Sequence, residues 1–199
     1  MMCPPDITIV VACIAAYLLG SIPTGLLLGK ACGIDVRKEG SGNIGATNLY
    51  RTVGRKVGVL TLIFDCLKGL VPVLVVRSMG LPAGLVALVG LAAFSGHVFS
   101  VFLCFKGGKG VATALGVFLG LAPLAVAIAL GVFAALMLKW RYVSLGSISA
   151  AAVMPLAVLL LGNGRGVVFV TTIIAVIVIV KHLENIKRLV SGTENKFKA

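Results

Sequence analysis

Two polar, glycine-rich segments lie between long apolar runs and carry the residues best suited to chemistry. The first glycine loop is GSGNIGATN, Gly40–Asn48, followed by Arg51; the second glycine loop is FKGGKGVAT, Phe105–Thr113, which contains Lys106 and Lys109. Glycine lets backbone N–H groups approach an anion closely, and Arg and Lys side chains supply the opposite charge. The two loops therefore predict a phosphate-binding site, although neither has the spacing of a Walker A loop. One such loop could be explained by close helix packing alone, but two of the same kind favour function.

The composition places these loops in a membrane protein. The 199 residues are 59% hydrophobic with a mean hydropathy of +1.13, which is too much apolar surface for one water-soluble core. The net charge of +12 would suit a nucleic-acid partner, but the basic residues lie between apolar runs, so we expect none. We expect a single domain over residues 1–199, an all-α integral membrane protein.

The cysteine and histidine content argues against a metal site. The chain has only two histidines, and its five cysteines include no C-x-x-C pair. We expect no metal, no cofactor, and free thiols at Cys3, Cys13, Cys32, Cys66 and Cys104.

The positions of the basic residues predict seven transmembrane helices, with the N-terminus outside and the C-terminus in the cytoplasm. Lys and Arg are favoured in cytoplasmic loops, and this topology puts 15 of the 18 there. The uncharged run 111–138 must then be two short crossings broken near Gly120 and Pro123, because a single crossing would separate basic residues that belong on one side. The predicted spans are 7–29, kept rather than cleaved as a leader, 57–76, 81–105, two within 111–138, 144–161, and one from 166 that continues as a helix through 181–188.

A few charged or titratable residues lie within or beside these spans. Asp65 and Lys68 are three apart on one helical face, which favours an ion pair over a polar cavity. His97 is interpreted as a hydrogen-bonded packing residue. Glu184 has basic residues within helical reach, which predicts a surface ion pair.

The predicted topology brings four polar segments to the cytoplasmic face: the two glycine loops, RYVSLGS at Arg141–Ser147, and KHLENIKR at Lys181–Arg188. Polar groups at membrane depth are costly unless they satisfy one another or a ligand. We therefore expect them to share an anionic ligand near the membrane surface. The hydroxyl and amide groups available for hydrogen bonds belong to Ser41, Asn43, Thr47, Asn48, Ser144 and Ser147.

These segments, with GHVFSVFLCFKGGKGVAT around the second loop and HLENIKRL near the end, resemble the PlsY family of bacterial membrane glycerol 3-phosphate acyltransferases. The resemblance extends over almost the whole chain. It implies a seven-helix bundle in the cytoplasmic (inner) membrane, surrounded by membrane lipid, with its motifs on the cytoplasmic side. It also implies transfer of a fatty acyl group from acyl phosphate to the 1-hydroxyl of glycerol 3-phosphate, giving lysophosphatidic acid and inorganic phosphate.

By motif position, the resemblance implies a substrate site in which Ser41, Arg51, Lys109, His182 and Asn185 are the catalytic candidates. We expect the substrate-binding residues to be Asn43, Thr47, Asn48, Lys106, Gly107, Gly108, Ser144 and Ser147, with the choice between the two serines left open. His182 and Glu184 are titratable side chains that could take the proton of the hydroxyl. The family is also thought able to use the phosphate of the substrate, and the sequence does not choose between these bases.

Two other classes of protein fit the sequence less well. A soluble-type acyltransferase would need an aspartate five positions after a histidine, but Phe102 follows His97 and Lys187 follows His182 at that spacing. An anion channel or transporter would need ionisable residues along its path, and the predicted spans have none besides Asp65 and Lys68. No inverted repeat is visible in the sequence.

Overall fold

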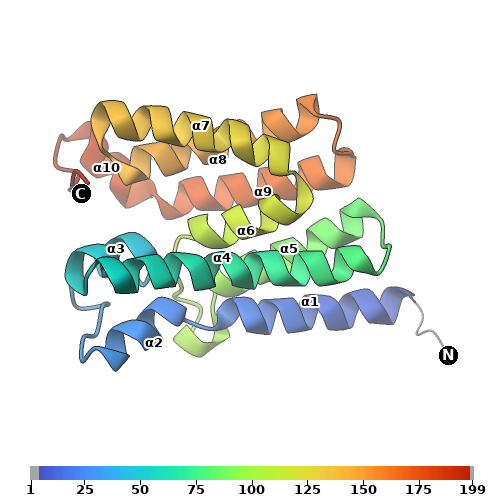
Figure 1. Cartoon of the computed structure of the whole chain (residues 1–199), viewed down its shortest axis with the longest axis horizontal. Helices are drawn as coiled ribbons and strands as arrows, with labels where there is room; N and C mark the ends of the chain where they lie inside the picture. Colours follow the sequence, from blue (N-terminus) through green and yellow to red (C-terminus); the bar gives the residue numbers. More distant parts are fainter. Residues whose placement is uncertain (1–4, 198–199) are drawn as a thin grey trace. The chain divides into compact units, whose positions relative to one another are not determined.

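A computed structural model describes residues 5–197, and within them the chain is all-helical, without a β-strand. The described residues form ten α-helices and one short 3-10 helix (Figure 1). In chain order these are α1 (Pro5–Ser21), α2 (Thr24–Ala31), α3 (Ala46–Thr52), α4 (Arg55–Ser78), α5 (Ala83–Val98), η1 (Val101–Leu103), α6 (Val111–Leu121), α7 (Pro123–Trp140), α8 (Val143–Leu160), α9 (Arg165–Lys181) and α10 (Leu183–Val190).

Most of these helices could cross a membrane. Within the described residues, five helical segments are long and apolar enough, and α9 with α10 would make a sixth. The helix α6 is apolar but has only 11 residues. Large apolar side chains such as Leu138 and Leu160, 86% and 76% exposed, lie on the surface, as expected for faces that contact lipid. Seven crossings with an outer N-terminus stay a prediction.

One break between helices lies where the sequence predicted it, and two others interrupt segments that were predicted to be continuous helices. The break near Gly120 and Pro123 is confirmed, since Pro123 is the first residue of α7, a position where its missing N–H costs no hydrogen bond. The first predicted span is interrupted at 22–23, between α1 and α2. The helix predicted to continue through 181–188 is instead bent by 55° at His182.

The chain divides after Leu121 into two compact units, and the single domain over residues 1–199 stays a prediction. In unit 1, α5 packs against α1, α4 and α6, and α4 runs beside α1 in the opposite direction (Figure 1). The crossing of α1 and α5 depends on small residues: a Cβ added to Gly20 would lie 2.0 Å from the Ala93 carbonyl oxygen, and one added to Gly96 would lie 2.1 Å from that of Tyr17. Such close backbone approach is how membrane helices gain packing energy.

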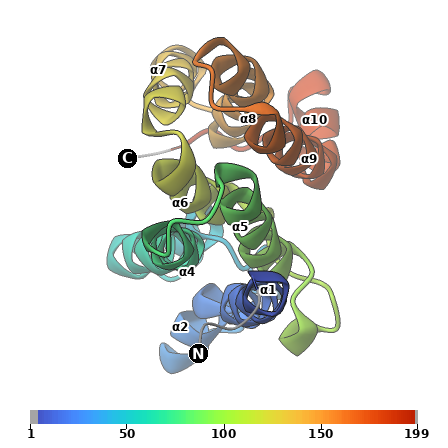
Figure 2. The same cartoon turned by 90° about the vertical axis from the view of Figure 1, so that its right-hand side faces the viewer.

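Unit 2 is a bundle of α7, α8 and α9, with α10 at one end. Figure 2, which views the helices closer to end-on, shows α8 against both α7 and α9. The short helix α10 packs on α8 and α9. The bend at His182 therefore turns the chain from the 17-residue helix α9 into a short helix that covers the end of the bundle.

Candidate functional site

The first glycine loop is built around the side chain of Asn48, at the start of α3. Its Nδ2 donates to the backbone carbonyls of Val36 and Glu39, both at 3.1 Å, and of Asn43 at 2.8 Å. Its Oδ1 accepts a 2.9 Å hydrogen bond from the backbone N–H of Ser41. Asn48 is only 3% exposed, so these bonds satisfy a buried amide and fix the loop. The structure thus gives Asn48 a positioning role within the loop.

Other predicted residues of this loop lie nearer the solvent. Ser41 and Arg51 are exposed, the latter in the last turn of α3. Asn43 and Thr47 are partly buried, and the Oδ1 of Asn43 accepts a 3.2 Å hydrogen bond from the N–H of Gly45. An exposed hydroxyl and an exposed guanidinium, close together in the chain, are groups that can donate hydrogen bonds to a phosphate.

The second glycine loop lies on the C-terminal end of α5. The N–H groups of Gly107 and Gly108 donate to the carbonyls of Val98 and His97, at 3.2 and 3.1 Å. A Cβ at Gly107 would lie 2.0 Å from the His97 oxygen, so only glycine allows this approach. Lys109 follows directly and is partly buried.

In unit 2, the carboxylate of Glu194 accepts hydrogen bonds from three side chains. Two of them, Ser144 and Asn185, are predicted site residues, and the third is Arg188. Its Oε1 accepts from the Ser144 hydroxyl and from Asn185 Nδ2, and its Oε2 accepts from Arg188 Nε, all at 2.7 Å. Burial alone would raise the pKa of Glu194, but the hydrogen bonds from Ser144, Asn185 and Arg188 outweigh it and lower the pKa below its ordinary value. These contacts tie the start of α8 to α10 and to the segment after it.

The side chains of the predicted residues Ser147 and His182 each contact a backbone carbonyl oxygen four residues earlier in the chain. The Ser147 hydroxyl donates to the Val143 carbonyl at 2.8 Å. His182 Nδ1 lies 2.7 Å from the Val178 carbonyl oxygen, which can only accept, so Nδ1 carries the hydrogen. In the neutral ring the lone pair is then on Nε2, as a general base requires.

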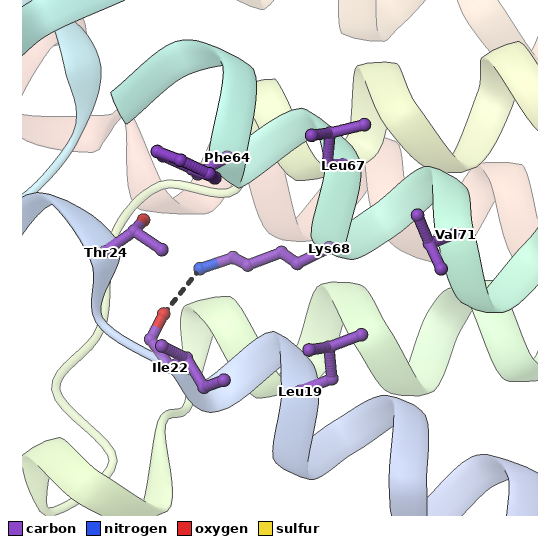
Figure 3. Close-up of a pocket in the computed structure, with 7 residues that line it drawn as sticks. All are labelled: Leu19, Ile22, Thr24, Phe64, Leu67, Lys68 and Val71. Carbon is purple, nitrogen blue, oxygen red and sulfur yellow. Dashed lines mark hydrogen bonds between the residues drawn. The ribbon is translucent and has the colours of Figure 1, made fainter. Parts of the chain in front are cut away.

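Asp65 and Lys68 form the predicted ion pair, at 2.9 Å, and both are buried on α4. Figure 3 shows Lys68 extending from α4 toward the carbonyl of Ile22. Lys68 is one of the residues that line a pocket of about 270 Å³, whose other side chains are mainly apolar. His97, interpreted from the sequence as a packing residue, lies with its Nδ1 3.6 Å from the same carboxylate. The predicted surface pair of Glu184 is also present, with Lys187 at 3.0 Å.

The predicted site residues differ in how far they are exposed to solvent, and some of them are in contact. Asn48 contacts Ser41 and Asn43 directly, and Ser144 and Asn185 share Glu194. That the residues of the two units bind one substrate stays a prediction. The exposed residues are Ser41, Arg51 and Lys106; the partly buried ones are Asn43, Thr47, Gly107 and Lys109; the buried ones are Asn48, Gly108, Ser144, Ser147, His182 and Asn185.

Sequence reasoning missed Glu194 and the contact of His97 with Asp65. A signal for Glu194 was present, because it is an acidic residue in a strongly basic C-terminal segment. Among residues 5–197, no three His, Cys, Asp or Glu side chains are grouped so that they could hold a metal ion. Four cysteines in this range are free, and the predicted free thiol Cys3 lies outside the described residues.

The apolar helices of membrane length define the class of the chain as integral membrane proteins. A family model described as glycerol-3-phosphate acyltransferase matches residues 10–192. The chain belongs to this family and is an integral membrane acyltransferase of phospholipid synthesis.

Similar proteins match over nearly their whole length. Glycerol-3-phosphate acyltransferases from Trichlorobacter lovleyi and Geobacter sulfurreducens are 69% and 64% identical, each over 92% of this chain and 95% of the relative. A crystal structure of PlsY, an integral membrane glycerol 3-phosphate acyltransferase, in its glycerol 3-phosphate form is similar with a TM-score of 0.92 and 43% identity, over 96% of both chains. The lysophosphatidic acid form of PlsY gives 0.89 and 42%, also over 96% of both. The resemblance inferred from the motifs is confirmed.

Proposed function

We propose that this chain transfers a fatty acyl group from acyl phosphate to the 1-hydroxyl of sn-glycerol 3-phosphate. The hydroxyl oxygen bonds to the acyl carbon, the bond from that carbon to the phosphate oxygen breaks, and the hydroxyl proton passes to a base. The products are lysophosphatidic acid and inorganic phosphate. The reaction would take place at the cytoplasmic face of the bacterial inner membrane, where the positive-inside rule puts the basic loops.

One observation carries the proposal: the chain matches PlsY over 96% of both chains, in structures described as its glycerol 3-phosphate form and its lysophosphatidic acid form. The second of these molecules is the first with an acyl group added, so the two forms correspond to the acceptor before and after the proposed transfer. The donor is proposed from the motifs, which resemble those of the family that uses acyl phosphate.

The residues suit this chemistry because both substrates are anions. Acyl phosphate already has a good leaving group, so the protein must chiefly hold two negative charges together and orient them. Arg51 and Lys109 would bind phosphate, and Ser41 would donate a hydrogen bond from its exposed hydroxyl. Charge that develops on the acyl oxygen would be stabilised by these basic side chains, because the N–H groups of Gly107 and Gly108 already donate to carbonyls of α5.

Two bases remain in the proposal. His182 is supported by its hydrogen bond to Val178, which leaves the lone pair on Nε2. The phosphate of the substrate is the alternative. Replacing His182 by Gln separates them: if His182 is the base, kcat falls by about 100-fold or more and the pH dependence of kcat loses its histidine limb. A pH profile that keeps its shape would assign the proton to the phosphate.

The deciding experiment measures phosphate release by the purified protein. Release should require acyl phosphate and glycerol 3-phosphate together, and lysophosphatidic acid should form in equal amount. Acyl-CoA and the acyl thioester of acyl carrier protein, tested as other donors, should give no product. Arg51→Lys should already lower the rate, because a point charge does not replace a planar two-pronged donor. Activity with acyl-CoA and none with acyl phosphate would refute the proposed donor.

A further inference from the structure

A buried cluster of charged and polar side chains lies beneath the second glycine loop in unit 1. Asp65 and Lys68 on α4 and His97 on α5 are 2%, 5% and 4% exposed. Ionisable side chains are costly within a membrane protein unless partners satisfy them. Their contacts therefore define what the cluster holds in place.

The carboxylate of Asp65 is the centre of this cluster. Its Oδ1 is bonded by Lys68 Nζ at 2.9 Å and by the hydroxyl of Thr24 on α2. Lys68 Nζ also donates to the Ile22 carbonyl at 2.9 Å, at the break between α1 and α2 (Figure 3). His97 Nδ1 lies 3.6 Å from the same Oδ1. Asp65 thus connects α2, α4 and α5 at one point.

The other side of the His97 ring faces the second glycine loop. A Cβ added to Gly108 would lie 2.3 Å from His97 Nε2, so the ring is packed directly against this glycine. The backbone of His97 accepts the N–H of Gly108, and the neighbouring Val98 accepts that of Gly107. Lys109 is the next residue along the chain, so the position of its backbone depends on His97.

A simple ion pair would not need this arrangement. Asp65 and Lys68 are three residues apart on one helix and neutralise each other without any contact from α5. The histidine adds a link from the pair to the loop, with its ring between the carboxylate and Gly108. We propose that Asp65 and His97 are positioning residues, which hold the second glycine loop so that Lys109 meets the substrate phosphate. This inference rests on the proposed function for the role of Lys109.

The test combines hydrogen exchange of the loop with steady-state kinetics on the full chain in detergent. His97→Ala removes the ring and keeps the ion pair, whereas the double variant Asp65→Leu/Lys68→Met removes both charges and keeps the ring. In each, the amides of Gly107 and Gly108 should exchange at least about tenfold faster than in the wild type, since their contacts on α5 are loosened. The value of kcat/KM for glycerol 3-phosphate should fall by up to about 100-fold, as expected for a displaced binding group.

Thr61→Val is the matched control. Thr61 is also buried on α4, at 0% exposed, and its hydroxyl donates to the Val57 carbonyl on its own helix. This variant should leave loop exchange and kcat/KM within about twofold of the wild type, because a single bond within a helix contributes little.

The inference is overturned if loop exchange matches the wild type in both His97→Ala and the double variant. It is also overturned if exchange rises equally along the whole of α4 and α5, because the cluster would then only stabilise the fold. A wild type that releases no phosphate would refute the proposed function instead. The exchange measurement does not depend on catalysis, so the two failures are distinguishable.

Discussion

Replacing Glu194 by Ala should destabilise unit 2 more than any other single carboxylate change in the C-terminal segment. The side chain is 6% exposed and accepts three hydrogen bonds of 2.7 Å, two of them from the buried Ser144 and Asn185. A donor left buried without a partner costs about 1–3 kcal/mol. The third donor, Arg188, is 36% exposed, and its lost ion pair adds at most about 1 kcal/mol because water screens it. The expected loss is about 3 kcal/mol.

Thermal unfolding in detergent measures this loss. For a chain of this length, about 3 kcal/mol corresponds to a fall in Tm of about 6–12 °C. Glu184→Ala is the matched control, because Glu184 also forms an ion pair but is 72% exposed with a partner, Lys187, that is 74% exposed. That variant should shift Tm by less than about 2 °C. A Glu194→Ala variant that melts like the Glu184→Ala variant would refute the reasoning.

The same carboxylate predicts a pH dependence. The pKa of Glu194 in the folded protein lies below its ordinary value near 4.5, so the folded state favours the charged form. The stabilisation is then fully present above about pH 4.5 and is lost as the pH falls through the lower folded pKa. The difference in Tm between wild type and Glu194→Gln should therefore shrink as the pH is lowered from about 6 to about 3. A constant difference would show that charge plays no part.

Three further predictions concern the site and the membrane. Lys109→Ala should lower kcat/KM by at least about 100-fold. Its control is Lys56→Ala, which removes an exposed lysine at the start of α4 and should leave kcat/KM within about twofold. Equal effects would show only a general need for positive charge. In a cysteine-free background, a single cysteine at the exposed position Lys106 should be labelled from the cytoplasm, and one at the exposed position Leu124 should be labelled from outside. Labelling of position 124 only from inside would disprove the two short crossings. Initial-rate plots for the two substrates should intersect, and no acyl group should be trapped on Ser41 when glycerol 3-phosphate is withheld, whereas parallel lines would indicate an acyl-enzyme.

The sequence predicted helix positions well where a boundary has a local cause. Pro123 cannot continue the hydrogen bonds of a helix, so the end of α6 and the start of α7 could be placed within a few residues. The bend at His182 has no such marker, because Lys181–Arg188 is a good helical sequence by itself. It is packing of α10 on α8 and α9, together with the bonds to Glu194, that holds the bent form.

The candidate site was predictable as motifs but not as contacts. Glycine and lysine in the second loop indicated phosphate binding, since backbone access and charge can be inferred from composition. The role of Asn48 could not be inferred, because the residue type alone does not tell whether its amide binds a ligand or, as here, three backbone carbonyls of the preceding segment. The link from Asp65 to His97 joins residues 32 positions apart, and only the packing of α4 against α5 brings them together.

The placement of Asp65 and Lys68 on one helix also affects how the protein enters the membrane during synthesis. A single charged residue at the centre of a helix adds about 2.5–3.5 kcal/mol to the apparent free energy of insertion. Because this pair is three residues apart, its bond can form as soon as that part of α4 is helical. The translocon then receives a nearly neutral apolar helix, whose two charges pair without any contact from α5. Had the two charges been on different helices, each helix would have entered the bilayer with an unpaired charge and waited for its partner.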